Sequence, residues 1–120
     1  MKKICLVLGI VTFVFSTAIG VYAKEHSAKK DSYTMKYDLT GTKNTAAGAY
    51  TSSNGATDVI AFVSMFSYKD NTVKNSTSGQ RIGYISKTLA SNNGNRFVSY
   101  HNLKDDSYKP IGTSLYLELK

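Results

Sequence analysis

The side chains best suited to acid–base chemistry are few and scattered in this sequence. Its two histidines are His26, in a polar stretch near the N-terminus, and His101, near the end of an alternating segment. Two histidines so far apart give no zinc-ligand spacing, and a lone histidine is most often a structural residue. Because His101 shares its face with Phe97 and Ser99, we expect it at a core edge or along a groove.

Nucleophilic and metal-binding motifs are also missing. The one cysteine, Cys5, lies close to the N-terminus, and no serine sits in a G-x-S-x-G motif. Ser27 and Lys30 match S-x-x-K only within a short polar stretch that offers no helix to present them. Asp105 and Asp106 are adjacent, but the D-x-D-x-D-G pattern of a calcium loop is absent.

Paired carboxylates are the one catalytic arrangement that the sequence leaves open. Glycoside hydrolysis needs only two acids at a suitable separation, and several acids far apart in the sequence could meet in a folded structure. These acids are Asp38, Asp58, Asp70 and Glu118. Since no motif brings them together, we predict a protein that is not an enzyme and that has no cofactor and no metal site.

The first 23 residues have the pattern of a cleaved signal peptide. An apolar run over residues 4–22 follows Lys2 and Lys3 and ends in the small-residue site Val-Tyr-Ala at residues 21–23. The alternative is an uncleaved N-terminal anchor, because the run is long enough for a membrane-spanning helix. We therefore expect a secreted or envelope-associated protein whose mature chain has no membrane span and, without Cys5, no disulfide.

The chain is basic, but its basic residues are not concentrated. The formal net charge is +7 at pH 7, and beyond the signal peptide only Lys29 and Lys30 are adjacent cations. A protein that reads nucleic acid usually gathers its basic residues on one face or helix, so we do not expect a nucleic-acid partner. Diffuse positive charge suits an anionic polymer of the cell envelope, or it serves solubility alone.

Residues 32–120 are expected to form one all-β domain after a flexible polar lead-in at residues 24–31. Short runs of aromatic and β-branched residues recur between stretches rich in Ser, Thr, Asn and Gly. Strands are expected over residues 32–40, 47–52, 58–68, 80–89, 95–103 and 111–120, with loops over 69–79 and 104–110 and a hairpin connection over 90–94. The pattern predicts a small antiparallel β-sandwich or barrel of five to six strands.

Two of these segments carry most of the functional inference. Residues 58–68 have apolar side chains on both faces, which indicates a central strand covered on both sides. In residues 111–120 the leucines share one face, so Tyr116 and Lys120 fall on the polar one. The unpaired edge of this last strand could add to a partner's sheet or form a homodimer.

Tyrosine is the residue type that favours binding over catalysis here. The sequence has nine tyrosines and no tryptophan, and exposed tyrosines among Ser, Asn and Lys form amphipathic surfaces for sugars, peptides or wall polymers. Tyrosine is also an ordinary sheet residue that packs in cores. The candidate surface residues are Tyr116, Lys120, His101 and Tyr100.

Part of the sequence resembles a known family. Residues 85–89 (ISKTL) and residues 92–102 (NNGNRFVSYHN) are similar to the closing strands of the small β-sandwich lactococcins, bacteriocins that target a cell-wall precursor. The resemblance is confined to these segments; the chain continues beyond them and lacks the tryptophan that this family uses. It implies a secreted antagonist of competing bacteria as the alternative. The residues themselves favour a secreted bacterial interaction protein that binds a wall polymer, a glycan or a protein partner.

Overall fold

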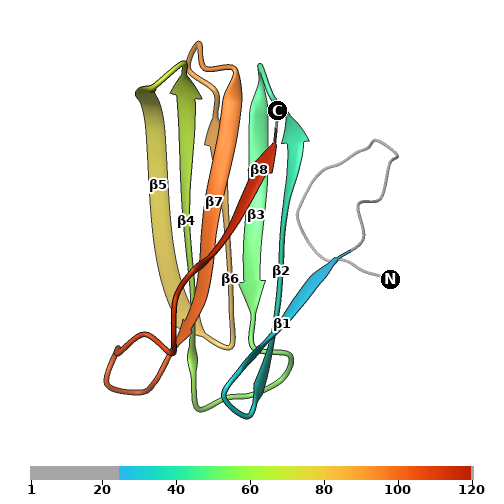
Figure 1. Ribbon diagram of the computed structural model, residues 1–120, viewed down its shortest axis with the longest axis vertical. Helices are drawn as coiled ribbons and strands as arrows, with labels where there is room; N and C mark the ends of the chain where they lie inside the picture. Colours follow the sequence, from blue (N-terminus) through green and yellow to red (C-terminus); the bar gives the residue numbers. More distant parts are fainter. Residues whose placement is uncertain (1–24, 120) are drawn as a thin grey trace.

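The computed structural model describes residues 25–119, which form two four-stranded antiparallel sheets packed face to face as a sandwich (Figure 1). We call the sheet with strand order β1-β2-β3-β6 sheet A and the sheet with order β5-β4-β7-β8 sheet B. The strands are β1 (His26–Lys30), β2 (Tyr33–Thr42), β3 (Ala46–Ser52), β4 (Ile60–Lys69), β5 (Thr72–Ile82), β6 (Tyr84–Ala90), β7 (Arg96–Lys104) and β8 (Leu115–Leu119). The predicted all-β sandwich is confirmed, with eight strands in the described chain rather than five or six.

The core lies between the sheets and follows the two-residue alternation of the strands. On β2, Met35, Tyr37 and Leu39 are buried, as the alternation in the sequence predicted. They meet the inward side chains of β4 and β7, such as Met65 and Phe97, which are fully buried. The predicted strands at β2, β3, β4 and β7 are therefore confirmed, with boundaries that shift by a few residues.

Two strands were not expected from the sequence. All five residues of β1 pair with β2, although residues 24–31 were expected to be a flexible lead-in. Strand β5 pairs along its length with β4, although residues 69–79 were expected to be a loop. Both strands lie at sheet edges and carry polar residues on both faces. Hydrogen bonds to the neighbouring strand form them, and their sequences lack the alternation of apolar and polar residues that predicts a strand.

The predicted hairpin over residues 80–103 is wrong, because its two strands belong to different sheets. Residues 80–89 are divided at Gly83, which has a positive φ of 81° and lies between β5 of sheet B and β6 of sheet A. The amide of Ser53 donates to the carbonyl of Gly83, and the amide of Gly83 donates to that of Val59. A second crossing over residues 91–95 returns the chain to sheet B. Composition marks the second crossing as a turn but does not say which sheet follows, and the break at Gly83 was not predicted.

The end of the chain is also shorter as a strand than expected. The predicted loop over residues 104–110 begins one residue later, because Lys104 ends β7, and only Leu115–Leu119 of residues 111–120 pair with β7. Gly112 has a positive φ of 72° before this strand. The predicted signal peptide and Lys120 lie outside the described residues. Among the residues described, no helix has the length and apolar character needed to cross a membrane.

The return crossing is packed so closely that it yields a stability prediction. A Cβ on Gly94 would overlap the Oγ of Ser67 and lie 2.9 Å from the carbonyl oxygen of Tyr68. Ser67 is buried and donates to the carbonyl of Ser91 at 2.6 Å. Gly94→Ala should therefore destabilise the protein by about 1–3 kcal/mol through overpacking, lowering the melting temperature by at least about 4 °C.

Gly48→Ala is the matched control for this substitution. A Cβ on Gly48 would meet its nearest neighbour, the carbonyl oxygen of Lys87, at 3.7 Å, which is ordinary contact. Alanine also costs less chain entropy than glycine in a strand. Thermal unfolding followed by circular dichroism should leave Gly48→Ala within about 0.5 kcal/mol of the parent. Equal losses in the two variants would contradict the packing argument.

Candidate functional site

The outer face of sheet B carries a row of aromatic side chains that no other layer of the described structure covers. These side chains alternate with the core residues of their strands, so they point away from sheet A. Phe62, Phe66 and Tyr68 come from β4, Tyr100 from β7 and Tyr116 from β8. We call these five residues the aromatic face. The sequence predicted β4 as a central strand, and it is one, but it is covered by a second sheet on one side only.

Ring contacts join most of this face into one surface across three strands. The rings of Phe66 and Tyr100 meet edge to face with centroids 6.1 Å apart, and Phe66 lies 6.2 Å from Tyr68. Tyr100 is 5.4 Å from Tyr116, its register partner on β8. Val98 on β7, the register partner of Phe66, is only 1% exposed although it faces outward. The rings therefore form a packed layer of their own and hold one another in place.

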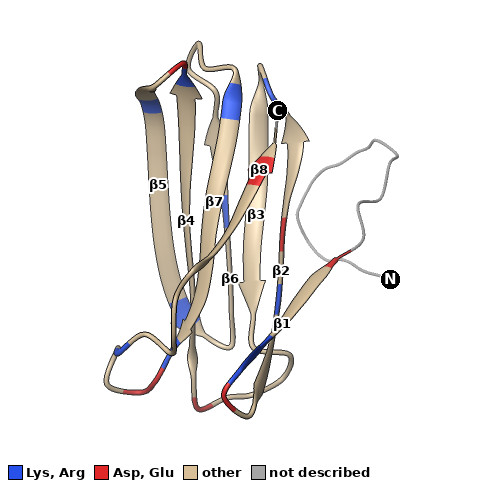
Figure 2. Cartoon of the chain, in the orientation of Figure 1, with Lys and Arg blue, Asp and Glu red and all other residues tan. Residues whose placement is uncertain are grey.

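A basic side chain lies at each end of the row. The guanidinium of Arg96 is 4.6 Å from the centroid of the Tyr68 ring, and the ammonium of Lys104 is 4.4 Å from that of Phe62. Both cations belong to β7 and are eight positions apart, a span of about 27 Å in an extended strand. Figure 2 shows basic residues near both ends of sheet B. Each pair is a cation–π contact that keeps the charge next to the rings.

Polar contacts fix the two cations and the most exposed ring of the aromatic face, Tyr116. Arg96 donates to the carbonyl of Asp70 at 3.1 Å and lies 3.8 Å from the carboxylate of Glu118. The ammonium of Lys104 donates to the side-chain oxygen of Gln80 at 2.7 Å. The hydroxyl of Tyr116 donates to Glu118 at 2.8 Å. Burial and this hydrogen bond raise the pKa of Tyr116, so the phenol stays neutral and can take part in hydrogen bonds at neutral pH.

The structure brings together two of the four candidate surface residues. Tyr100 and Tyr116 are neighbours on the aromatic face, and Tyr116 is 47% exposed. Lys120 lies outside the described residues. The assignment of His101 to the surface is wrong, because its side chain points between the sheets and is fully buried. Sequence reasoning missed Phe62, Phe66 and Tyr68 as surface residues, although their alternation with the core residues was visible.

His101 is a buried polar contact between the two sheets. Its Nδ1 is 2.8 Å from the hydroxyl of Thr51 on β3, and its Nε2 is 2.6 Å from the hydroxyl of Ser99. The ring also packs against Tyr37, with centroids 5.0 Å apart. Burial lowers the pKa of His101 to about 3, so the ring is neutral and both of its nitrogens have partners. This arrangement is structural, because it is closed to any substrate.

The four acids considered for a catalytic pair do not converge. Asp58 and Asp70 lie beyond opposite ends of β4. Asp38 and Glu118 are on the outer faces of opposite sheets, and Asp38 lies beside His26 at 3.5 Å. Within the described residues there is no group of three or more metal-ligating side chains.

Comparison of the chain with protein-family models, with curated proteins and with solved structures gives no match. Function is therefore inferred from the geometry of the described residues. In that geometry the aromatic face gathers five rings and two cations on the outer side of sheet B, and ring contacts join four of these rings. Such a surface can stack on apolar rings and attract anions.

The buried groups predict an unusual dependence of stability on pH. Burial raises the pKa of Asp38 to about 6, above its value of about 3.9 in an unfolded chain. Between pH 6 and 4 the native state therefore holds a proton on Asp38 that the unfolded state releases, which stabilises the fold as pH falls. His101 has the opposite effect over the same range. Its ring takes up a proton in the unfolded state but not in the native state, so it destabilises the fold as pH falls.

Asp38→Asn removes one of these opposing effects and exposes the other. The parent should change little in stability between pH 6 and 4, and should lose stability below pH 4, where only His101 still titrates. The variant should lose about 1.4 kcal/mol per pH unit between pH 6 and 4. Urea unfolding at several pH values measures both slopes. If the free energy of unfolding of the variant changes as little between pH 6 and 4 as that of the parent, the two groups do not oppose one another.

Proposed function

We propose that this protein is a non-enzymatic binding module that acts at or outside the cell envelope. In this proposal the aromatic face binds an extended anionic polymer, such as a glycan of the cell wall. The observation that carries the proposal is the row of five rings on a sheet face open to solvent, with Arg96 and Lys104 at its two ends. The basic net charge and the signal-peptide pattern of the sequence agree with this location.

The chemistry of the face suits a sugar polymer. Aromatic rings offer flat apolar surfaces against which the apolar faces of sugar rings can stack, and the hydroxyls of Tyr68, Tyr100 and Tyr116 supply hydrogen bonds at the edges of those rings. Arg96 and Lys104 would attract acidic groups along the polymer. Because the rings already contact one another, few side-chain rotamers need to be ordered when a ligand binds.

The size of the face favours an extended ligand over a second copy of the chain. Three strands spaced about 4.8 Å apart, taken over a length of about 27 Å, give an area of roughly 400 Å². A stable protein–protein interface usually buries about 800 Å² on each partner. A flexible polymer needs no such area in one module, since repeated weak contacts along it add together.

Tyr116→Ala should weaken binding to purified cell walls by about tenfold, which corresponds to the loss of about 1.4 kcal/mol. The reason is that Tyr116 is the most exposed ring of the aromatic face. Tyr84→Ala is the matched control, because Tyr84 is 45% exposed and lies on sheet A. Co-sedimentation of the purified protein with cell walls, at low and at high salt, gives both affinities.

Comparing co-sedimentation at low and at high salt separates specific contacts from diffuse electrostatic attraction. Binding that survives high salt and is lost in Tyr116→Ala supports the aromatic face as the ligand site. Binding of all variants that disappears together at high salt reduces the interaction to net charge. If the parent does not sediment with cell walls at either salt, or if Tyr84→Ala and Tyr116→Ala lose equally, the proposal is wrong.

A further inference from the structure

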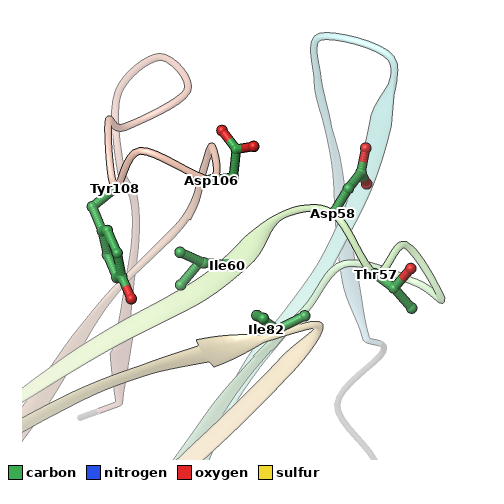
Figure 3. A pocket seen from close by; sticks show the side chains of 6 residues that line it. All are labelled: Thr57, Asp58, Ile60, Ile82, Asp106 and Tyr108. Carbon is green, nitrogen blue, oxygen red and sulfur yellow. The ribbon is translucent and has the colours of Figure 1, made fainter.

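One end of the sandwich carries a second surface feature, close to the end of the aromatic face at which Lys104, the register partner of Ile60, lies over Phe62. A depression opens where β4 begins and β5 ends, next to the connection between β7 and β8 (Figure 3). Its lining consists of Thr57, Asp58, Ile60, Ile82, Asp106 and Tyr108. Figure 3 shows three apolar side chains from three segments gathered on one side and two carboxylates along the other. The depression therefore combines an apolar wall with an acidic rim.

The apolar wall is unusually exposed for residues of its type. Ile82 is 63% exposed and Tyr108 is 60% exposed, the highest values among the large hydrophobic side chains of the described chain. Between them lies Ile60, whose side chain is buried and forms the floor. Exposed apolar side chains grouped around one depression mark a surface suited to an apolar partner group.

The loop that presents Tyr108 is held by its own hydrogen bonds. One carboxylate oxygen of Asp105 accepts from the amides of Ser107 and Lys109, at 2.9 and 3.0 Å. The amide of Tyr108 donates to the carbonyl of Asp105 at 2.9 Å. The backbone that carries the ring is thus held in one conformation, which lowers the entropy cost of ordering the loop on binding.

The acidic rim places negative charge beside the depression of a protein that is basic overall. Asp58 accepts a hydrogen bond from the hydroxyl of Tyr33 at 2.8 Å, which orients its carboxylate. That hydrogen bond, together with the charges of Asp58, Asp106 and Asp31, raises the pKa of Tyr33. All three carboxylates therefore act on the same point. A cation is attracted here, although the chain as a whole carries a net charge of +7.

Two carboxylates beside one depression could also suggest catalysis or metal binding, but their surroundings argue against both. Asp58 and Asp106 are exposed, whereas a carboxyl group that acts as a general acid is usually placed in an apolar environment. No group of three or more metal-ligating side chains occurs in the part of the chain that is described. Charge recognition is the role that exposed acids next to apolar side chains can perform.

We propose that this depression binds a lysine side chain of a partner polypeptide. The alkyl stem of the lysine packs along Ile82 and the Tyr108 ring, and its ammonium lies between the carboxylates of Asp58 and Asp106. The stem and the charge are both required, because the wall alone would accept any apolar group and the rim alone any cation. This inference is independent of the polymer proposed for the aromatic face.

The test uses Nα-acetyl-lysine N-methylamide as the probe and the matching norleucine derivative as its uncharged counterpart. Titration of the purified protein, followed by NMR shifts of the Ile60 and Ile82 methyl groups, measures binding at this site. The lysine probe should bind with an affinity in the millimolar range, and the norleucine derivative at least about fivefold more weakly, as expected for an exposed ion pair.

Three variants locate the effect. Asp106→Asn should weaken the lysine probe about fivefold, whereas Asp70→Asn, at the other end of β4, should have no effect. Tyr108→Asn removes the ring but keeps a residue that tolerates the positive φ of 66° at this position, so it tests the wall without unfolding the loop. Equal binding of the two probes, an unchanged Asp106→Asn, or shifts confined to other residues would overturn the proposal.

Discussion

The pairing of β4 with both β5 and β7 determines which side chains of sheet B face the core and which face solvent. Because side chains alternate along a strand, a slip of one residue would place Phe62, Phe66 and Tyr68 between the sheets and expose Val63 and Met65. The buried residues of β4 are small or flexible enough to fit against sheet A, and its rings are too many for so thin a core. Core packing thus places the aromatic face outside, and the fold and the proposed binding surface depend on the same register.

A buried polar contact also links the two sheets, whereas many small secreted domains are held together by disulfides. Thr51 of sheet A and Ser99 of sheet B both bond to the ring of His101. A neutral histidine can donate from one nitrogen and accept at the other, so both hydroxyls find a partner without any buried charge. Replacing the ring by an apolar side chain would leave two buried hydroxyls unsatisfied, which costs more than the hydrogen bonds gain. The contact therefore specifies how the two sheets align.

Sequence reasoning found strands that carry apolar side chains on at least one face and missed β1 and β5, which carry polar side chains on both. Strand β2 was readable because buried and solvated side chains alternate, whereas β5 offers Ser, Thr, Asn and Gly on both faces and is formed by pairing with β4. Tyr116 was predicted to be a surface residue because it shares a face with polar neighbours. His101 was expected at a core edge or a groove because it shares a face with Phe97 and Ser99, but the alternation does not show that this face is fully covered by the other sheet. The depression at Tyr108 could not be foreseen, since it joins three connections far apart in the sequence.

The two proposed surfaces differ in charge, and this difference follows from where each lies in the fold. The aromatic face is on the open side of a sheet, where Arg96 and Lys104 lie against rings at the two ends of the row. The depression is at the sandwich end, where Asp58 and Asp106 lie in the connections that precede β4 and follow β7. Under the two proposals, a ligand with acidic groups would be attracted to the first surface and repelled from the second. One small domain would then hold a polymer on its sheet face while its end remains available to a basic polypeptide.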